Sequence, residues 1–181
     1  GAIRSRIKER LKEVRKGLTI AKWRMWGQRL QGVNDPSASA PRKSPPTGGE
    51  VELGKMLFFD GRLSGDGTMS CAACHNGINV GGGRYAPFGI VEKPGAELLP
   101  PADKGRFAVT KTAGDEYVFK VPTLRNIELT APYFHSGRSW DLGQAVGVMS
   151  ASQLGLPVTD EEAGKIVAFL GALTGDQPKL V

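Results

Sequence analysis

The sequence has only two cysteines and two histidines among its 181 residues. Zinc sites built from four Cys or His side chains, and iron–sulfur clusters held by four thiolates, are therefore nearly excluded. Apolar runs are also short, and none approaches the roughly 18 to 20 residues that a membrane span needs. We therefore expect no transmembrane segment.

Aromatic residues make up only 7% of the chain, which is little for the core of a domain of this size. The 25 glycines and 12 prolines together form about a fifth of the residues, so much of the chain must be loop. A large, flat, apolar cofactor would supply the interior surface that the side chains do not. The length suits one domain with residues to spare.

Positive charge is concentrated at the N-terminus. The net charge is +6, but residues 1–30 hold ten Lys or Arg against two Glu, so the rest of the chain sums to −2. Apolar residues recur there at steps of three to five, which predicts a basic amphipathic helical arm over 1–33. Four prolines and three serines in 34–49 predict a linker. A single domain over 50–181 follows.

The pattern within 50–181 predicts an all-α fold with long loops. We expect a short helix over 50–58, a helix near 140–150 and a closing helix over 160–173. Thr159 and Glu162 form a capping box, the signal that starts the closing helix. The stretch between the first two helices shows little regular pattern.

The segment Cys71-Ala72-Ala73-Cys74-His75 is a C-x-x-C-H motif, the attachment signature of c-type haem. On a helical turn, thiols three residues apart lie on one face, where both can form thioethers to the haem, and the next residue supplies the proximal imidazole. The alternatives are a redox disulfide and half of a zinc site. The adjoining histidine and the lack of other cysteines weaken both alternatives, so the motif predicts one covalently bound haem c.

An electron-transfer haem needs a sixth iron ligand, and the sequence offers five candidates, namely His135, Met25, Met56, Met69 and Met149. Met25 lies in the basic arm, and Met69 lies only two residues before the motif. Met56 is interpreted as core. Met149 ends a predicted helix 74 residues after the proximal histidine, so it is the best geometric candidate. Ordinary core packing is its alternative role.

Three stretches resemble the bacterial di-haem cytochrome c peroxidase family, which includes relatives that modify partner proteins. Residues 53–75, LGKMLFFDGRLSGDGTMSCAACH, resemble the segment that leads into the family's first haem motif. Residues 105–149, with VPTLRN and APYFHSG, resemble the second, electron-accepting haem domain, and 159–174 resemble its closing helix. The likeness covers about 53–174 and leaves residues 1–52 outside.

The resemblance implies roles for several side chains. Met149 would be the distal ligand of the electron-accepting haem. Arg125 would pair with a haem propionate, with a structural loop anchor as its alternative role. Pro122 and Tyr133 would line the haem pocket. His135 would lie near the haem without binding the iron, and a hydrogen-bonded loop histidine is the favoured alternative.

The chain departs from the family in carrying one haem motif where di-haem members carry two. A six-coordinate His/Met iron leaves no vacant position for peroxide. We therefore expect a mono-haem c-type cytochrome that transfers single electrons. The alternative is a peroxidase in which Met149 dissociates and peroxide is reduced at the opened site; a sensor or assembly role is a third class that no residue favours. Calcium is a further cofactor that the resemblance implies, through backbone oxygens near Thr130 and Pro132, although only one domain is present.

Partners and compartment follow from the same chemistry. A redox protein would dock at the haem edge, and the basic arm would bind another protein subunit or an acidic surface. We expect no nucleic acid partner. Haem attachment to paired thiols takes place outside the bacterial cytoplasm, which predicts the periplasm. The chain opens at Gly1 without a methionine or visible signal peptide, as expected of a processed or cloned form.

Overall fold

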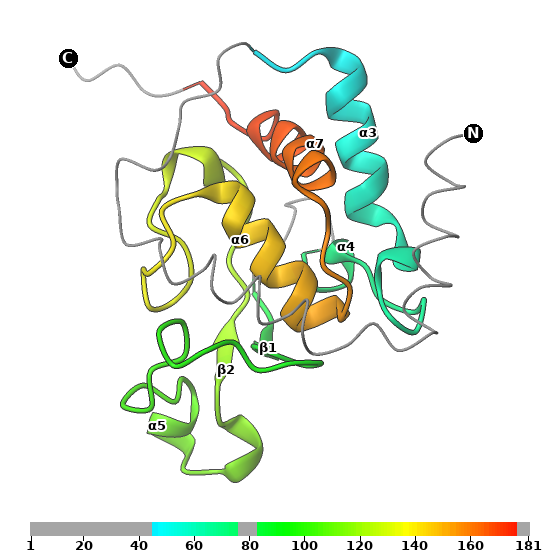
Figure 1. Cartoon of the computed structure of the whole chain (residues 1–181). Helices are drawn as coiled ribbons and strands as arrows, with labels where there is room; N and C mark the ends of the chain where they lie inside the picture. Colours follow the sequence, from blue (N-terminus) through cyan, green and yellow to red (C-terminus); the bar gives the residue numbers. More distant parts are fainter. Residues whose placement is uncertain (1–44, 76–82, 177–181) are drawn as a thin grey trace, which may run out of the picture.

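The computed structural model describes residues 45–75 and 83–176 (Figure 1). The predicted basic arm and residues 34–44 of the predicted linker lie outside the described residues. The α-helices and strands are α3 (Gly48–Phe59), α4 (Cys71–Cys74), β1 (Tyr85–Pro87), α5 (Phe107–Thr110), β2 (Val118–Lys120), α6 (Leu142–Met149) and α7 (Asp160–Gly171). The other helical turns are η1 (Gly61–Leu63), η2 (Ala113–Asp115), η3 (Ile127–Leu129) and η4 (Ser150–Leu154).

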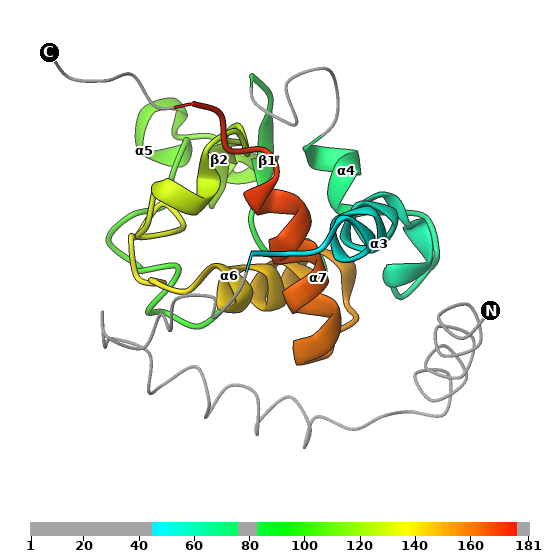
Figure 2. The same cartoon turned by 90° about the horizontal axis from the view of Figure 1, so that it is seen from above.

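The first and last described helices, α3 and α7, lie side by side in both views (Figures 1 and 2). Gly54 makes this close approach possible, because a Cβ atom there would overlap the carbonyl oxygen of Lys165. Phe58 and Phe169 pack across the same interface, with ring centroids 5.4 Å apart. The two helices therefore form a tightly packed pair.

Both helices begin with a capping box. The predicted box of α7 is confirmed: the amide of Glu162 donates to Thr159 Oγ1 over 3.2 Å, and the amide of Thr159 donates to Glu162 Oε2 over 2.7 Å. Thr47 and Glu50 form the same arrangement at α3. Helix α3 therefore begins two residues earlier than expected, inside the predicted linker.

One buried cluster joins α3, α6 and α7 to the motif-bearing turn α4. Its members include Leu57, Phe58, Ala72, Leu142, Ala145, Ile166, Phe169 and Leu170. The predicted apolar face of the closing helix belongs to it, since Ala163, Ile166 and Leu170 are buried and Val167 and Leu173 pack against them. The cysteine-bearing turn is thus anchored in the core through Ala72.

Met56 lies on the surface, and its predicted core position is wrong: 64% of the residue is exposed. The reason is geometric: Gly54, Leu57 and Phe58 define the buried face of α3, and Met56 falls on the other side of the helix.

The fold is mainly helical, as predicted, but it is not all-helical. Helices dominate, but β1 and β2 form a two-stranded antiparallel sheet in which Ala86 lies opposite Phe119. Strands of three residues are too short to show an alternating pattern, so sequence reasoning missed them. Among the described residues, no helix is both long and apolar enough to cross a bilayer.

Candidate haem site

The C-x-x-C-H motif forms a single helical turn, as its spacing predicts. Helix α4 runs from Cys71 to Cys74, and His75 ends it with its amide donating to the carbonyl oxygen of Cys71 over 3.1 Å. Both cysteines are free and half-buried. Residues three apart on a helix share a face, so the two sulfur atoms and the following imidazole come from one short, core-anchored segment.

The surroundings of His75 favour a neutral imidazole. Burial lowers the pKa of His75, and the backbone carbonyl of Pro122 opposes this shift. The Nδ1 atom is buried and has no hydrogen-bond partner. Iron binds the neutral ring, and a carbonyl beside Nδ1 is the usual support of a metal-bound histidine. His75 therefore fits a proximal haem ligand.

The state of Cys71 argues against a redox disulfide. Burial is the main cause that raises the pKa of the Cys71 thiol to about 12, and the neighbouring Cys74 adds to it. Reactive C-x-x-C thiols instead have lowered pKa values, because the thiolate is the nucleophile. A neutral, apolar thioether suits these surroundings better than a thiolate does. For the zinc alternative, no three Cys, His, Asp or Glu side chains within 45–75 and 83–176 lie close enough together to hold a metal ion.

Met149 is the last residue of α6 and is half-buried, between the buried Val148 and Ser150. Figure 2, the view from above, shows α4 and α6 apart from each other: α4 lies toward the back of the molecule as drawn in Figure 1, and α6 lies toward the front. His75 and Met149 therefore come from two separate elements, the ends of α4 and α6.

His135 has the contacts of a hydrogen-bonded loop histidine. Its Nε2 atom lies 2.7 Å from Asp103 Oδ2, and its ring packs against Phe119 with centroids 4.6 Å apart. Its side chain is 55% exposed. These partners account for His135 without an iron bond.

The remaining predicted site residues occupy different surroundings. Tyr133 is buried in the same cluster as Ala72, and burial, followed by Asp141 and Glu128, raises its pKa. Pro122 and Arg125 are exposed. Pro122 approaches His75 through its carbonyl, whereas the backbone amide of Arg125 donates to Thr123 Oγ1 over 3.3 Å.

Sequence reasoning missed a contact that supports the haem motif. The guanidinium of Arg84 donates to the carbonyl oxygen of Ala73 over 3.1 Å, so the approach to β1 is tied to the motif. No spacing rule indicates such a contact, because it depends on the path of the intervening loop.

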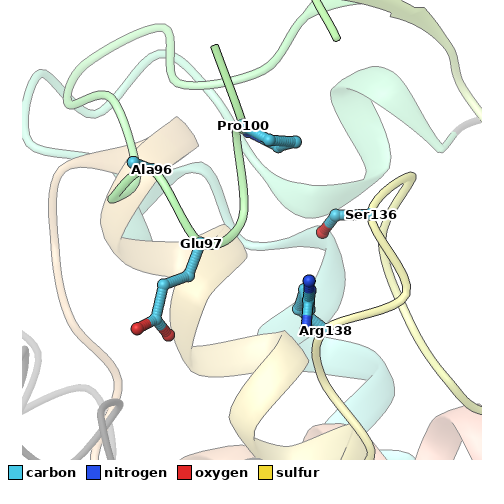
Figure 3. Close-up of a pocket in the computed structure, with 5 residues that line it drawn as sticks. All are labelled: Ala96, Glu97, Pro100, Ser136 and Arg138. Atoms are coloured by element: carbon cyan, nitrogen blue, oxygen red, sulfur yellow. The ribbon is translucent and has the colours of Figure 1, made fainter. Parts of the chain in front are cut away.

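A pocket of about 370 Å³ lies among the loops (Figure 3). Its lining includes Ala96, Glu97, Pro100, Ser136 and Arg138. The hydroxyl of Ser136 is buried and has no hydrogen-bond partner. Glu97 and Arg138 give the pocket both signs of charge, and none of the predicted haem residues is part of this lining.

Comparison with known proteins places these observations in a family. The chain is 58% identical over 110 residues to cytochrome c551 peroxidase of Pseudomonas aeruginosa, covering 61% of this chain and 32% of the relative. It is 44% identical over 126 residues to a cytochrome c peroxidase of Escherichia coli, covering 70% of this chain and 25% of the relative. The chain thus spans a third or less of these curated relatives.

A solved structure shares the fold. The crystal structure of a MauG-like protein associated with microbial copper homeostasis matches with a TM-score of 0.55 and 23% identity, over 72% of this chain and 48% of that one. The sequence model described as di-haem cytochrome c peroxidase matches residues 49–170, which is most of the chain. The match takes in the haem motif, the loops around it and the closing helix, and the chain belongs to the di-haem cytochrome c peroxidase family.

Proposed function

We propose that this chain is a mono-haem c-type cytochrome that transfers single electrons between redox partners. Cys71 and Cys74 would hold the haem through thioethers, with His75 and Met149 as the axial ligands. The observation that carries the proposal is the α4 turn, which places both cysteines and the half-buried imidazole of His75 on one short segment. The haem, when bound, would supply the one-electron chemistry of ferric and ferrous iron.

The residues around the motif would hold the proximal side rigid. Ala72 fixes the turn in the core, and Arg84 ties it to the strand approach. The backbone of Pro122, which lies close to the His75 ring, would help to orient it. Tyr133 would line the haem pocket, and Arg125 would pair with a haem propionate.

The distal assignment of Met149 separates the two functions under consideration. A thioether on the sixth position raises the reduction potential and closes the iron to peroxide. The alternative is a peroxidase, and the names of the matched relatives support it. In that function Met149 would not hold the iron. The single haem motif favours the closed, electron-transferring form.

Compartment and partners follow as proposals. We place the protein in the periplasm, because haem is joined to paired thiols outside the bacterial cytoplasm. A redox protein would dock at the haem edge, and the basic segment 1–30 would bind an acidic subunit or surface. Calcium would require backbone oxygens near Thr130 and Pro132.

The rate of reaction with hydrogen peroxide tests the proposal against its alternative. We expect the reduced wild-type protein to be oxidised slowly by peroxide, and Met149→Ala to react at least about tenfold faster because its sixth position is open. Rapid, catalytic peroxide consumption by the wild type, unchanged in Met149→Ala, would favour the peroxidase.

A further inference from the structure

Gln153 is a buried amide that joins two distant parts of the chain. Its Oε1 atom accepts hydrogen bonds from the backbone amides of Gly89 and Ile90, both over 2.9 Å. Its Nε2 atom donates to the carbonyl oxygen of Pro87 over 3.0 Å. Only 8% of the residue is exposed. The side chain therefore connects η4 with the loop that leaves β1, and the two segments can be followed in Figure 1.

Backbone contacts reinforce the same junction. The carbonyl oxygen of Ser152 accepts from the amides of Val91 and Glu92, over 2.9 and 3.2 Å. At Gly155, where φ is +72°, a Cβ atom would lie 2.9 Å from Val91 Cγ1. The loop over 87–92, called here the β1 loop, is thus packed directly against η4.

The junction lies next to Met149 in the sequence, because η4 directly follows α6. Helix α6 ends at Met149, and η4 begins at the next residue as a π-helical turn whose five residues are all buried. Such turns are rare and are often found at functional sites. Because the regular α-helical ladder stops at Met149, the contacts of η4 decide how the end of α6 is held.

A methionine ligand needs such support. Its side chain has three rotatable bonds, and the thioether binds weakly enough to be displaced. A backbone fixed on both sides reduces the number of arrangements in which the sulfur leaves its position. The α6–α7 packing fixes the earlier side of Met149, and the Gln153 junction fixes the later side.

We propose that Gln153 is a positioning residue that fixes η4 on the β1 loop and thereby holds the Met149 thioether on the iron. This rests on the proposed function, because it takes Met149 as the distal ligand. The side chain of Gln153 contacts the backbone of Pro87, Gly89 and Ile90, so its effect on the Met149 thioether would be indirect. A purely structural glutamine would change only stability, so the test measures the sulfur–iron bond separately.

The experiment compares ferric holoprotein variants by the charge-transfer band of methionine-bound iron and by titration with imidazole, which competes for the sixth position. In Gln153→Leu all three side-chain hydrogen bonds are lost, and we expect half-displacement at roughly tenfold lower imidazole, the size that hydrogen bonds of ordinary strength would give. Gln153→Glu keeps the acceptor for the two amides but repels the Pro87 carbonyl. We expect a shift of about threefold for it.

Gln144→Leu is the matched control. Gln144 lies at the other end of α6, where its Oε1 accepts one hydrogen bond from Ser139 Oγ over 2.8 Å. This variant should lose stability in denaturant and keep the wild-type imidazole midpoint.

The possible outcomes separate the inference from the function beneath it. If Gln153→Leu has the same imidazole midpoint as Gln144→Leu, Gln153 is only structural and the inference is wrong, while the Met149 ligand stands. If Gln153→Leu does not fold, Gln153→Glu decides, and an unchanged midpoint overturns the inference. If the wild type lacks the band, or if Met149→Ala keeps it, the proposed function itself fails.

Discussion

The chemical state of individual side chains follows from their surroundings in the turn over 71–75. Burial lowers the pKa of His75 and raises the pKa of Cys71, and both directions favour the uncharged groups that an iron-bound imidazole and a thioether require. The motif predicted both the residue types and their helical turn, because C-x-x-C-H spacing has a local geometric cause. The surroundings that set the pKa values come from distant loops such as the one at Pro122.

Asp66 stabilises the approach to this turn. Its carboxylate accepts hydrogen bonds from the amide of Thr68 and the hydroxyl of Ser64, both over 2.9 Å, and the amide of Met69 donates to the same hydroxyl. Hydrogen bonds with Thr68, followed by Ser64, lower the pKa of Asp66 from 3.8 to about 2. The folded state therefore prefers the ionised form.

A pH dependence follows with a definite sign. Since the folded pKa is depressed, the stabilisation is present above the unfolded value of 3.8 and is lost as the pH falls toward 2. We expect Asp66→Asn to unfold at lower denaturant concentration than wild type at pH 7, with the difference closing as the pH falls through this range. Urea unfolding of the ferric holoprotein at several pH values measures it. A difference that stays constant down to pH 2 would contradict the hydrogen-bond account.

Two residues show where single-residue prediction stops. Met56 and Met149 have the same side chain, but Met56 is exposed because it lies on the outward face of α3. No sequence pattern predicted the buried contacts of Gln153, because a polar residue after a helix is ordinarily solvated. Its three partners lie more than 60 residues earlier in the sequence, and only the folded path of the β1 loop brings them together.

At the scale of elements, the contact between α3 and α7 depends on one missing side chain. Gly54→Ala would force the Lys165 carbonyl away and separate the two helices. We expect the free energy of unfolding to fall by about 2 to 3 kcal/mol, the usual cost of overpacking a core. Denaturant unfolding measures this change.

Gly49→Ala is its control within the same helix. No atom lies within 4 Å of a Cβ built at Gly49, so the variant should be neutral or more stable by up to about 1 kcal/mol. Equal effects of the two substitutions would mean that helix propensity, and not the α3–α7 contact, governs the result.

The capping boxes offer a second test among the elements. Thr159→Ala removes the hydroxyl that accepts from the Glu162 amide, and we expect a loss of about 1 kcal/mol in unfolding free energy. Thr159→Ser keeps the acceptor and should stay within about 0.5 kcal/mol of wild type. Thermal or denaturant unfolding compares the two, and a serine variant as unstable as the alanine one would point to lost methyl packing instead.

Prediction succeeded for elements with a local signal and failed for those without one. The closing helix has a start box and a regular apolar face, so its position was predicted well. The box at Thr47 has the same spacing, but Gly48 and Gly49 inside it read as part of the linker. Strands β1 and β2 are fixed by pairing across about thirty residues, a long-range contact that no short pattern carries.

At the scale of the whole molecule, the chain corresponds to about a third of the peroxidase from Pseudomonas aeruginosa. The sequence has one haem motif, and the transfer of electrons in preference to the reduction of peroxide stays a proposal. The family was predicted from VPTLRN, APYFHSG and the motif, and the comparisons confirm it. The ligand set and the mono-haem function stay proposals, because they depend on the bond between iron and Met149.

The most direct test of that bond is the ferric absorption spectrum of the wild-type holoprotein and of Met149→Ala. We predict that the wild type shows the weak long-wavelength charge-transfer band of methionine sulfur bound to ferric iron, and that Met149→Ala loses it. A wild-type spectrum of high-spin iron without this band would contradict the account, because the sixth position would then be open and Met149 would pack as an ordinary side chain.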